Sequence, residues 1–230
     1  MTLKNDYQKK VAEILISIKA VKFSFEKPFI LTSGLKSPVY VDCRKIISFV
    51  EEREKIINYA LNYFKKNNLQ FDILAGGETA GIPYSAFFSQ ILKKPMIYVR
   101  KKPKGFGKNQ QIEGNFRDNQ KVILIEDLAT DGGSKVNFVN ALRHAGARIT
   151  DIFVIFFYDI YPGALEALKH EGVDLHYLCT WKDVLQVAKA KKYYEPSVLK
   201  AVENFLMDPV SWSKKNGGSA GIDLNLNKNL

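Results

Sequence analysis

The stretch VILIEDLATDGGS, residues 122–134, decides the fold and the site. Its first four apolar residues form an expected buried strand, and two carboxylates, Glu126 and Asp127, follow at the carboxyl end. Open α/β sheets bind their ligands at that end of the strands. Gly132 and Gly133 then allow backbone N–H groups to turn toward an anion, and the next helix directs its positive end there. The stretch therefore predicts a site for a vicinal diol beside a phosphate.

A short acidic and glycine-rich match more often ends a strand and caps a helix than binds a ligand. The surrounding pattern favours a site, because strand-like and helix-like segments alternate on both sides of this stretch. We expect strands at residues 72–75, 96–99 and 152–157 and helices at about 81–92 and 134–145. This alternation predicts an α/β fold with a central, mostly parallel sheet flanked by helices.

The rest of the chain is less regular. We expect a helix at about residues 4–20, a hairpin at 29–42 and a charged helix at about 50–67. Residues 102–119 are rich in Gly, Asn and Gln and predict a long exposed loop, which in a compact domain is usually functional or disordered. Residues 1–212 are predicted to form a single domain, and the low-complexity residues 213–230 a flexible tail.

Composition restricts the class of protein. The 230 residues are 46% hydrophobic and 25% charged, which excludes extended disorder, and the net charge of +10 favours an anionic partner. The longest apolar run, residues 152–158, is far shorter than the roughly 20 residues that span a bilayer. The polar N-terminus lacks the features of a secretory signal, so a cytoplasmic location is expected. Cys43 and Cys179 and the three histidines show no metal-binding spacing.

Four segments, taken together, resemble a known enzyme family. Residues 122–134 resemble the phosphoribosyl-pyrophosphate motif of type I phosphoribosyltransferases. Three further segments resemble orotate phosphoribosyltransferases and occur in that family's order: FILTSGLKSPVYVDCR (29–44), AGGETAGIP (75–83), and YVRKKPKGFGK (98–108) with QIEG (111–114). The resemblance implies a small N-terminal hood, at about residues 1–45, and a long flexible catalytic loop.

The resemblance also implies a reaction: Mg²⁺-dependent transfer of ribose 5-phosphate from phosphoribosyl pyrophosphate to orotate, giving orotidine 5′-phosphate and pyrophosphate for pyrimidine synthesis. The loop carries five cations and no anion in residues 100–108, a charge that suits a departing diphosphate. A homodimer that shares loop 100–117 across its interface is implied, with no nucleic-acid or membrane partner.

Site residues follow from the motif positions. Lys104 and Asp127 are the expected catalytic residues, and Mg²⁺ is expected to bind through the diphosphate rather than directly to protein side chains. The expected ligands of phosphoribosyl pyrophosphate are Arg100, Lys101, Lys104, Glu126, Asp127, Ala129, Thr130, Asp131, Gly132, Gly133, Ser134, Gly76, Gly77 and Ala80. The expected ligands of orotate are Thr32, Ser33, Gly34, Tyr40 and Thr130.

Some positions depart from the family pattern. Thr32 and Ala80 stand where several members carry lysine, and Phe106 stands where they carry histidine. Several members also carry an arginine, near the position of Ile160, that pairs with the orotate carboxylate, and this chain lacks it. The remaining candidates for that carboxylate are Lys36, Arg44 and the backbone N–H groups around Ser33, Gly34 and Thr130. We expect the Asp131 side chain to point away from the phosphate.

Two other functions remain open at this point. The same fold could use another base, or it could serve as a regulator that binds nucleic acid and senses phosphoribosyl pyrophosphate. The charge of +10 motivates the second alternative, while the absence of a recognisable nucleic-acid-binding motif opposes it.

Overall fold

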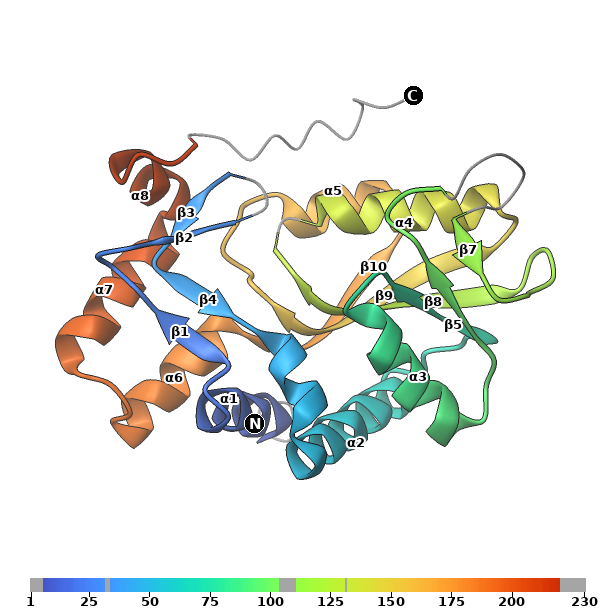
Figure 1. The fold of residues 1–230 in the computed structure, drawn as a ribbon. Coiled ribbons are helices and arrows are strands. Elements are labelled where there is room, and N and C mark those ends of the chain that lie inside the picture. Colours follow the sequence, from blue (N-terminus) through green and yellow to red (C-terminus); the bar gives the residue numbers. More distant parts are fainter. Residues whose placement is uncertain (1–5, 32–33, 104–110, 131, 220–230) are drawn as a thin grey trace.

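A six-stranded sheet lies at the centre of the computed structural model, which describes residues 6–31, 34–103, 111–130 and 132–219 (Figure 1). Neighbouring strands are parallel except for β7, which is antiparallel to β6 at the edge. In spatial order the strands are β10 (Asp174–Thr180), β9 (Arg148–Phe157), β8 (Lys121–Ala129), β5 (Ile73–Gly77), β6 (Met96–Val99) and β7 (Ile112–Glu113). The predicted α/β fold with a mostly parallel sheet is confirmed.

Helices cover both faces of this sheet, because its central strands are apolar on both sides. Ile123 and Ile125 of β8 face one hydrophobic core, and Val122 and Leu124 face the other. This alternation follows from the two-residue period of a strand. The first core is covered by α1 (Asp6–Ser17), α2 (Val50–Lys66) and α3 (Gly81–Leu92), and the second by α4 (Gly133–His144) and α5 (Ala164–His170).

The hood consists of short antiparallel pairs beside the sheet. Strand β2 (Phe29–Ile30) pairs with β3 (Lys36–Ser37), as the predicted hairpin requires. Strand β4 (Val39–Val41) instead pairs with β1 (Val21–Phe23), a strand too short for its pattern to predict. The 3₁₀ helix η2 (Cys43–Ser48) then leads from the hood into α2.

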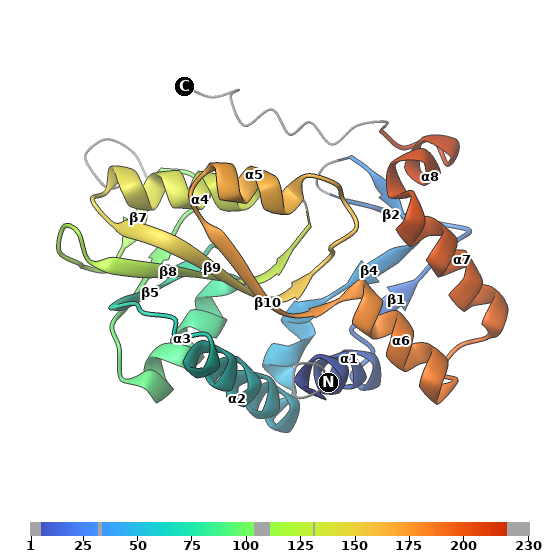
Figure 2. The same ribbon diagram turned by 180° about the vertical axis from the view of Figure 1, so that it is seen from behind.

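Three C-terminal helices lie along the hood in both views of the ribbon (Figure 2). They are α6 (Trp181–Lys191), α7 (Pro196–Met207) and α8 (Pro209–Lys215). Helix α8 crosses the predicted domain boundary at residue 212, and Ser213 is fully buried. Residues 213–219 therefore belong to the folded part of the chain, which corrects the predicted start of the tail, while residues 220–230 lie outside the described residues.

Other elements also differ from the predicted ones. Strand β8 continues to Ala129, so both carboxylates of the motif lie inside the strand. Strand β5 includes Gly76 and Gly77, which were expected in a turn, because their backbones pair with β6. Strand β7 lies within the expected loop 102–119. Within the described ranges, no helix is both long and apolar enough to cross a bilayer.

Candidate active site

Glu126 and Asp127 point to opposite faces of β8, since they are consecutive residues of one strand. Glu126 faces α4, where its Oε2 accepts a hydrogen bond of 2.6 Å from Lys135 Nζ. Asp127 faces the hood, and its Oδ1 accepts a hydrogen bond from Leu128 N at 2.8 Å. The two carboxylates are only 6% and 8% exposed. The strand thus presents one acid to each side of the phosphate-binding turn that follows it.

The surroundings of Glu126 require glycine at two positions. A Cβ atom on Gly77 would lie 2.2 Å from Glu126 Oε1, and one on Gly81 would lie 2.8 Å from the same oxygen. Within the described residues Oε1 is buried and accepts no hydrogen bond. A buried carboxylate oxygen is costly without a donor, so this atom is suited to accept one from a ligand.

Burial raises the pKa of both carboxyl groups. The charge of Lys135 opposes the rise at each of them, and at Asp127 the charge of Arg44 opposes it as well. Lys135 was not among the predicted site residues. A lysine in the first turn of the helix after an acidic strand end is a signal that could have found it, because that turn lies beside the strand end.

The turn predicted to bind phosphate links β8 to α4. Ala129 ends the strand and accepts a hydrogen bond from Tyr158 N at 2.9 Å. Gly132 has a φ of +85°, a conformation that favours glycine, and it caps α4 with its carbonyl, which accepts a hydrogen bond from Lys135 N. Thr130 follows the strand end, and Gly133 and Ser134 are the first two residues of α4. Asp131 lies outside the described residues, so its predicted orientation stays a prediction.

The glycine-rich segment after β5 contributes a tight turn beside the strand ends. Gly76 is paired on both sides, with β6 and β8, so the turn consists of residues 78–80. Ala80 caps α3, and the Glu78–Thr79 peptide bond is cis. Glu78 was missed by sequence reasoning: its Oε2 accepts a hydrogen bond of 2.7 Å from Lys101 N. This carboxylate holds the base of the predicted catalytic loop against the turn.

A second contact closes the base of that loop. Arg100 N donates to Gln111 O at 2.7 Å, and Arg100 Nη1 lies 3.5 Å from Glu113 Oε1. Arg100 and Lys101 are therefore placed next to the turn after β5. Lys104, the predicted catalytic lysine, lies outside the described residues.

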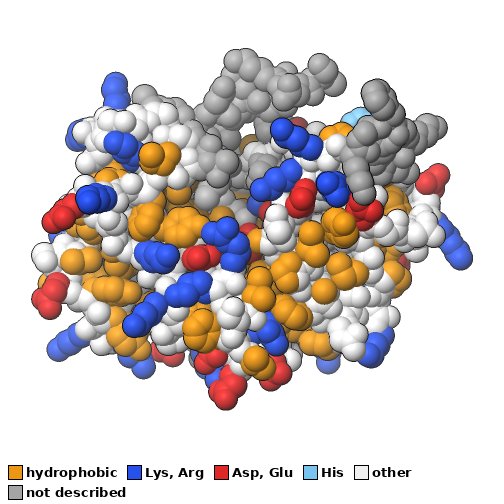
Figure 3. Space-filling view, viewed as in Figure 1, with side chains coloured by type: hydrophobic (Ala, Val, Ile, Leu, Met, Phe, Trp, Pro, Cys, Tyr) orange, Lys and Arg blue, Asp and Glu red, His pale blue; other side chains and the backbone are white. Residues whose placement is uncertain are grey.

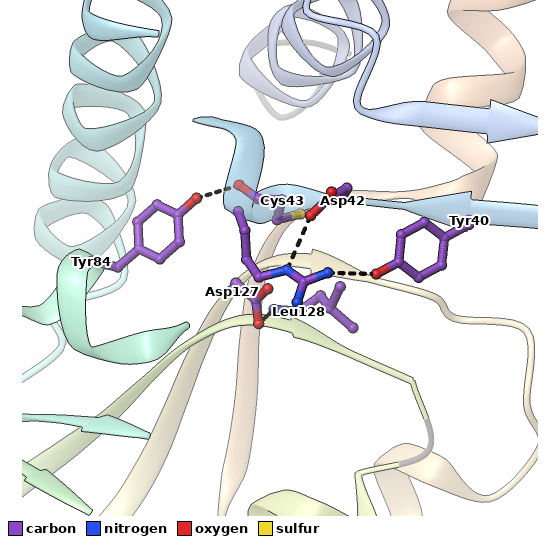
Figure 4. A network of polar contacts seen from close by, with 7 residues as sticks. Tyr40, Asp42, Cys43, Tyr84, Asp127 and Leu128 are labelled. Atoms are coloured by element: carbon purple, nitrogen blue, oxygen red, sulfur yellow. Dashed lines mark hydrogen bonds and ion pairs between the residues drawn. The ribbon is translucent and has the colours of Figure 1, made fainter. Parts of the chain in front are cut away.

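The hood contains Gly34 and Tyr40, the described residues that were predicted to bind orotate. Tyr40 accepts a hydrogen bond of 2.9 Å from Arg44 Nη2, and its ring lies 5.3 Å from that of Phe29. Figure 4 shows Asp127 below the hood residues Tyr40 and Asp42. The backbone at Gly34 has a φ of +80°. Thr32 and Ser33 lie outside the described residues.

A buried hydrogen bond connects η2 to helix α3 on this side. Tyr84 Oη of α3 donates to Cys43 O at 2.6 Å, so η2 is fixed above the end of β8 (Figure 4). In the space-filling view, Lys and Arg side chains gather along the hollow between the hood and the sheet (Figure 3). Asp127 lies below the hood on this side, at the end of β8.

The described residues contain no group of three or more His, Cys, Asp or Glu side chains that could hold a metal ion. Magnesium binds oxygen ligands and often keeps several waters beside one or two carboxylates and substrate phosphates. Glu126 and Asp127 are oxygen donors of that kind, so this site fits an Mg²⁺ ion that the substrate brings.

Comparisons with known proteins found relatives in sequence and in structure. The search against protein-family models found no match. The chain is 47% identical over 214 residues to a curated orotate phosphoribosyltransferase of Sinorhizobium medicae, covering 92% of each chain. It is 49% identical over 205 residues to that of Dinoroseobacter shibae, covering 88% of this chain and 91% of the relative.

Solved structures show the same fold. The UMP synthase of Leishmania donovani matches with a TM-score of 0.76 at 25% identity over 88% of this chain, which spans 42% of that protein. The orotate phosphoribosyltransferase of Aeropyrum pernix matches with a TM-score of 0.66 at 25% identity, covering 79% of this chain and 99% of that one.

Proposed function

The chain belongs to the orotate phosphoribosyltransferase family, and from this premise we propose that it transfers the phosphoribosyl group of phosphoribosyl pyrophosphate to orotate. The products are orotidine 5′-phosphate and pyrophosphate, as in pyrimidine biosynthesis. The observation that carries the proposal is the buried Glu126–Asp127 pair at the end of β8, beside the N-terminus of α4. We place the reaction in the cytoplasm.

The reaction forms one bond and breaks another at C1 of the ribose. A ring nitrogen of orotate bonds to C1 and gives up its proton, and the bond from C1 to the diphosphate oxygen breaks, so the diphosphate departs with the electron pair and the proton balances on the pyrophosphate product. Glu126 and Asp127 accept hydrogen bonds from the ribose hydroxyls, and the turn before α4 binds the 5′-phosphate through backbone N–H groups. This holds the sugar while positive charge develops on its ring.

The departing diphosphate requires cations. Arg100 and Lys101 at the base of the loop, and Lys104 beyond them, supply positive charge on the side of the turn after β5. When bound, Mg²⁺ neutralises diphosphate charge. The loop also excludes water from the activated sugar, which favours transfer to the base over hydrolysis.

A direct assay tests the function. Purified protein with Mg²⁺, orotate and phosphoribosyl pyrophosphate is expected to release pyrophosphate in proportion to orotate consumed. Excess EDTA is expected to abolish the release, and added Mg²⁺ to restore it. A panel of adenine, guanine, hypoxanthine and uracil tests the alternative base, and the absence of turnover with orotate would contradict the proposal.

The same preparation separates the enzyme from a nucleic-acid-binding regulator. A regulator is expected to bind RNA or DNA in a salt-sensitive manner and to show no turnover. The enzyme is expected to turn over and to show no such binding.

We further propose a homodimer in which each catalytic loop serves the partner's site. Exposed apolar side chains support this, because Phe49, Val50 and Ile91 lie at the surface of α2 and α3 or next to it. Between these helices is an open groove of about 320 Å³, which is lined in part by Phe87 and Arg53. A second copy of the chain would cover this surface.

A further inference from the structure

Orotate differs from uracil by a carboxylate, and a site selective for it needs a cation or several N–H donors facing the base. The inference below rests on the proposed function, because it concerns the base that this function assigns. The described part of the chain offers several cations near the hood. Their hydrogen bonds decide which of them is available to the base.

Most of the candidate donors already donate hydrogen bonds to backbone carbonyls of the chain. Lys36 Nζ donates to Asn216 O of the C-terminal segment at 2.8 Å, and Gly34 N donates to Leu31 O at 2.8 Å. Lys45 Nζ donates to Lys19 O at 3.0 Å, on the side of α1. Among the earlier candidates, Lys36 and the Gly34 N–H group are thereby disfavoured.

Arg53 and Arg44 differ in the contacts that their guanidinium groups make. Arg53 Nη1 donates to Ile47 O, and its guanidinium lies 4.6 Å from the centroid of the Phe87 ring, on the outer side of α2. Arg44 is 58% exposed and is held at two points: Nε donates to Asp42 Oδ1 at 3.1 Å, and Nη2 donates to Tyr40 Oη at 2.9 Å. Within the described residues its Nη1 makes no hydrogen bond.

The Nη1 group of Arg44 lies near the carboxyl end of β8. Tyr40 and Asp42, which hold it, lie above Asp127 in Figure 4, and its charge opposes the raised pKa of the Asp127 carboxyl. The guanidinium thus lies between the carboxylate predicted to bind the ribose and the tyrosine predicted to contact the base. Its planar edge matches a carboxylate in geometry and charge.

We propose that Arg44 is a specificity-determining residue that binds the carboxylate of orotate through its Nη1 edge. Asp42 and Tyr40 orient the guanidinium, so that little side-chain entropy is lost when the base binds. Lys22 is another cation near Tyr40, with its Nζ 6.0 Å from the centroid of the ring. Arg44, in contrast, donates a hydrogen bond to the Tyr40 hydroxyl.

Binding of the two nucleotides that differ only in the carboxylate tests the proposal without turnover. Calorimetry with orotidine 5′-phosphate and uridine 5′-phosphate is expected to show a preference for the first in the unchanged protein. Arg44→Ala is expected to reduce this preference roughly 10- to 100-fold by weakening orotidine 5′-phosphate alone. Arg44→Lys is expected to restore part of it. Lys45→Ala, the matched control, removes a neighbouring charge of η2 that points elsewhere and is expected to leave the preference unchanged.

Kinetics separates selectivity from a structural effect. Arg44→Ala is expected to raise the KM for orotate while the KM for phosphoribosyl pyrophosphate stays within about twofold. Tyr40→Phe, which keeps the ring and removes the acceptor of the Arg44 hydrogen bond, is expected to have a much smaller effect than Arg44→Ala. If Arg44→Ala fails to fold, as judged by circular dichroism, Arg44→Gln takes its place.

Three results would overturn the proposal. Equal weakening of both nucleotides would make Arg44 a structural residue, and a matching rise in the KM for phosphoribosyl pyrophosphate would place it on the other substrate. Loss of the preference in Lys22→Ala instead would assign the carboxylate to Lys22. None of these three results would contradict the proposed function, which fails only if the unchanged protein does not turn over orotate.

Discussion

At the scale of single residues, the contact between Glu126 and Lys135 governs the charge of the site. Both side chains are almost completely buried, and their 2.6 Å hydrogen bond links β8 to α4. Removing one partner of a buried ion pair typically costs about 3–5 kcal/mol, because the other charge is left without compensation. Glu126 would then take up a proton more readily than it does now.

We predict that Lys135→Met makes activity more sensitive to acid. Burial already raises the pKa of Glu126, and the variant removes the charge that lowers it. We proposed that the ionised Glu126 carboxylate accepts a hydrogen bond from a ribose hydroxyl. The acid limb of the pH profile of kcat/KM for phosphoribosyl pyrophosphate is therefore expected to move to higher pH. The pH profile measures this, with Lys169→Met on the exposed surface of α5 as control. An unmoved limb would show that Lys135 does not control this ionisation.

The same variant has a predicted effect on folding. In the folded variant the pKa of Glu126 lies above its unfolded value, so stability is lost as the pH rises from the unfolded pKa through the folded one. Urea unfolding at several pH values is expected to show Lys135→Met losing more stability relative to the unchanged protein at neutral than at acidic pH. A pH-independent difference would contradict this.

At the scale of elements, hydrophobic periodicity predicted α2, α3 and β6 almost to the residue, because each has one continuous apolar pattern. The same rule ended β8 too early, since Glu126 and Asp127 are polar although they continue the ladder with β9. The pairing of β4 with β1 depends on contacts between distant segments, which local pattern does not contain. The C-terminal helices carry no motif, so their packing against the hood was not predicted.

We predict that Ser213→Ala weakens the hood from a distance. The buried Ser213 Oγ accepts a hydrogen bond from Lys36 N at 3.0 Å and donates to Ser219 O at 2.9 Å. Its loss leaves both groups unpaired and is expected to lower the free energy of unfolding by about 1–3 kcal/mol. The KM for orotate is expected to rise several-fold, because Gly34 lies next to this contact, while that for phosphoribosyl pyrophosphate changes little.

Denaturant unfolding and steady-state kinetics measure both effects. Ser211→Ala is the matched control, since Ser211 lies in the same helix with an exposed side chain. Equal behaviour of the two variants would show that α8 does not support the hood.

At the scale of the whole molecule, the site is built from segments that a single motif cannot bring together. The sequence motifs indicated the two carboxylates, the turn before α4 and the loop base, which the structure places at neighbouring strand ends. They did not indicate Glu78 or Lys135, whose roles depend on neighbours contributed by other elements. Nor could they choose among Lys36, Arg44 and backbone donors, because that choice depends on where each group's hydrogen bonds are made.

We predict that the surface of α2 and α3 holds two copies together. Ile91 is 52% exposed, so Ile91→Glu is expected to leave the fold intact while placing a charge in the proposed interface. Sedimentation equilibrium is expected to show a dimer for the unchanged protein and a monomer for the variant, with much reduced activity. Glu54→Lys on the same groove serves as a milder control. A monomeric unchanged protein, or a fully active monomeric variant, would contradict loop sharing.

The bond between Lys36 and Ser213 joins residues separated by 177 positions. During synthesis on the ribosome, the hood strand emerges well before its partner in α8. Pairings this distant in sequence form late and slow the folding of a domain. We therefore expect the sheet to be assembled before the proposed orotate pocket, which gains its final shape as α8 docks.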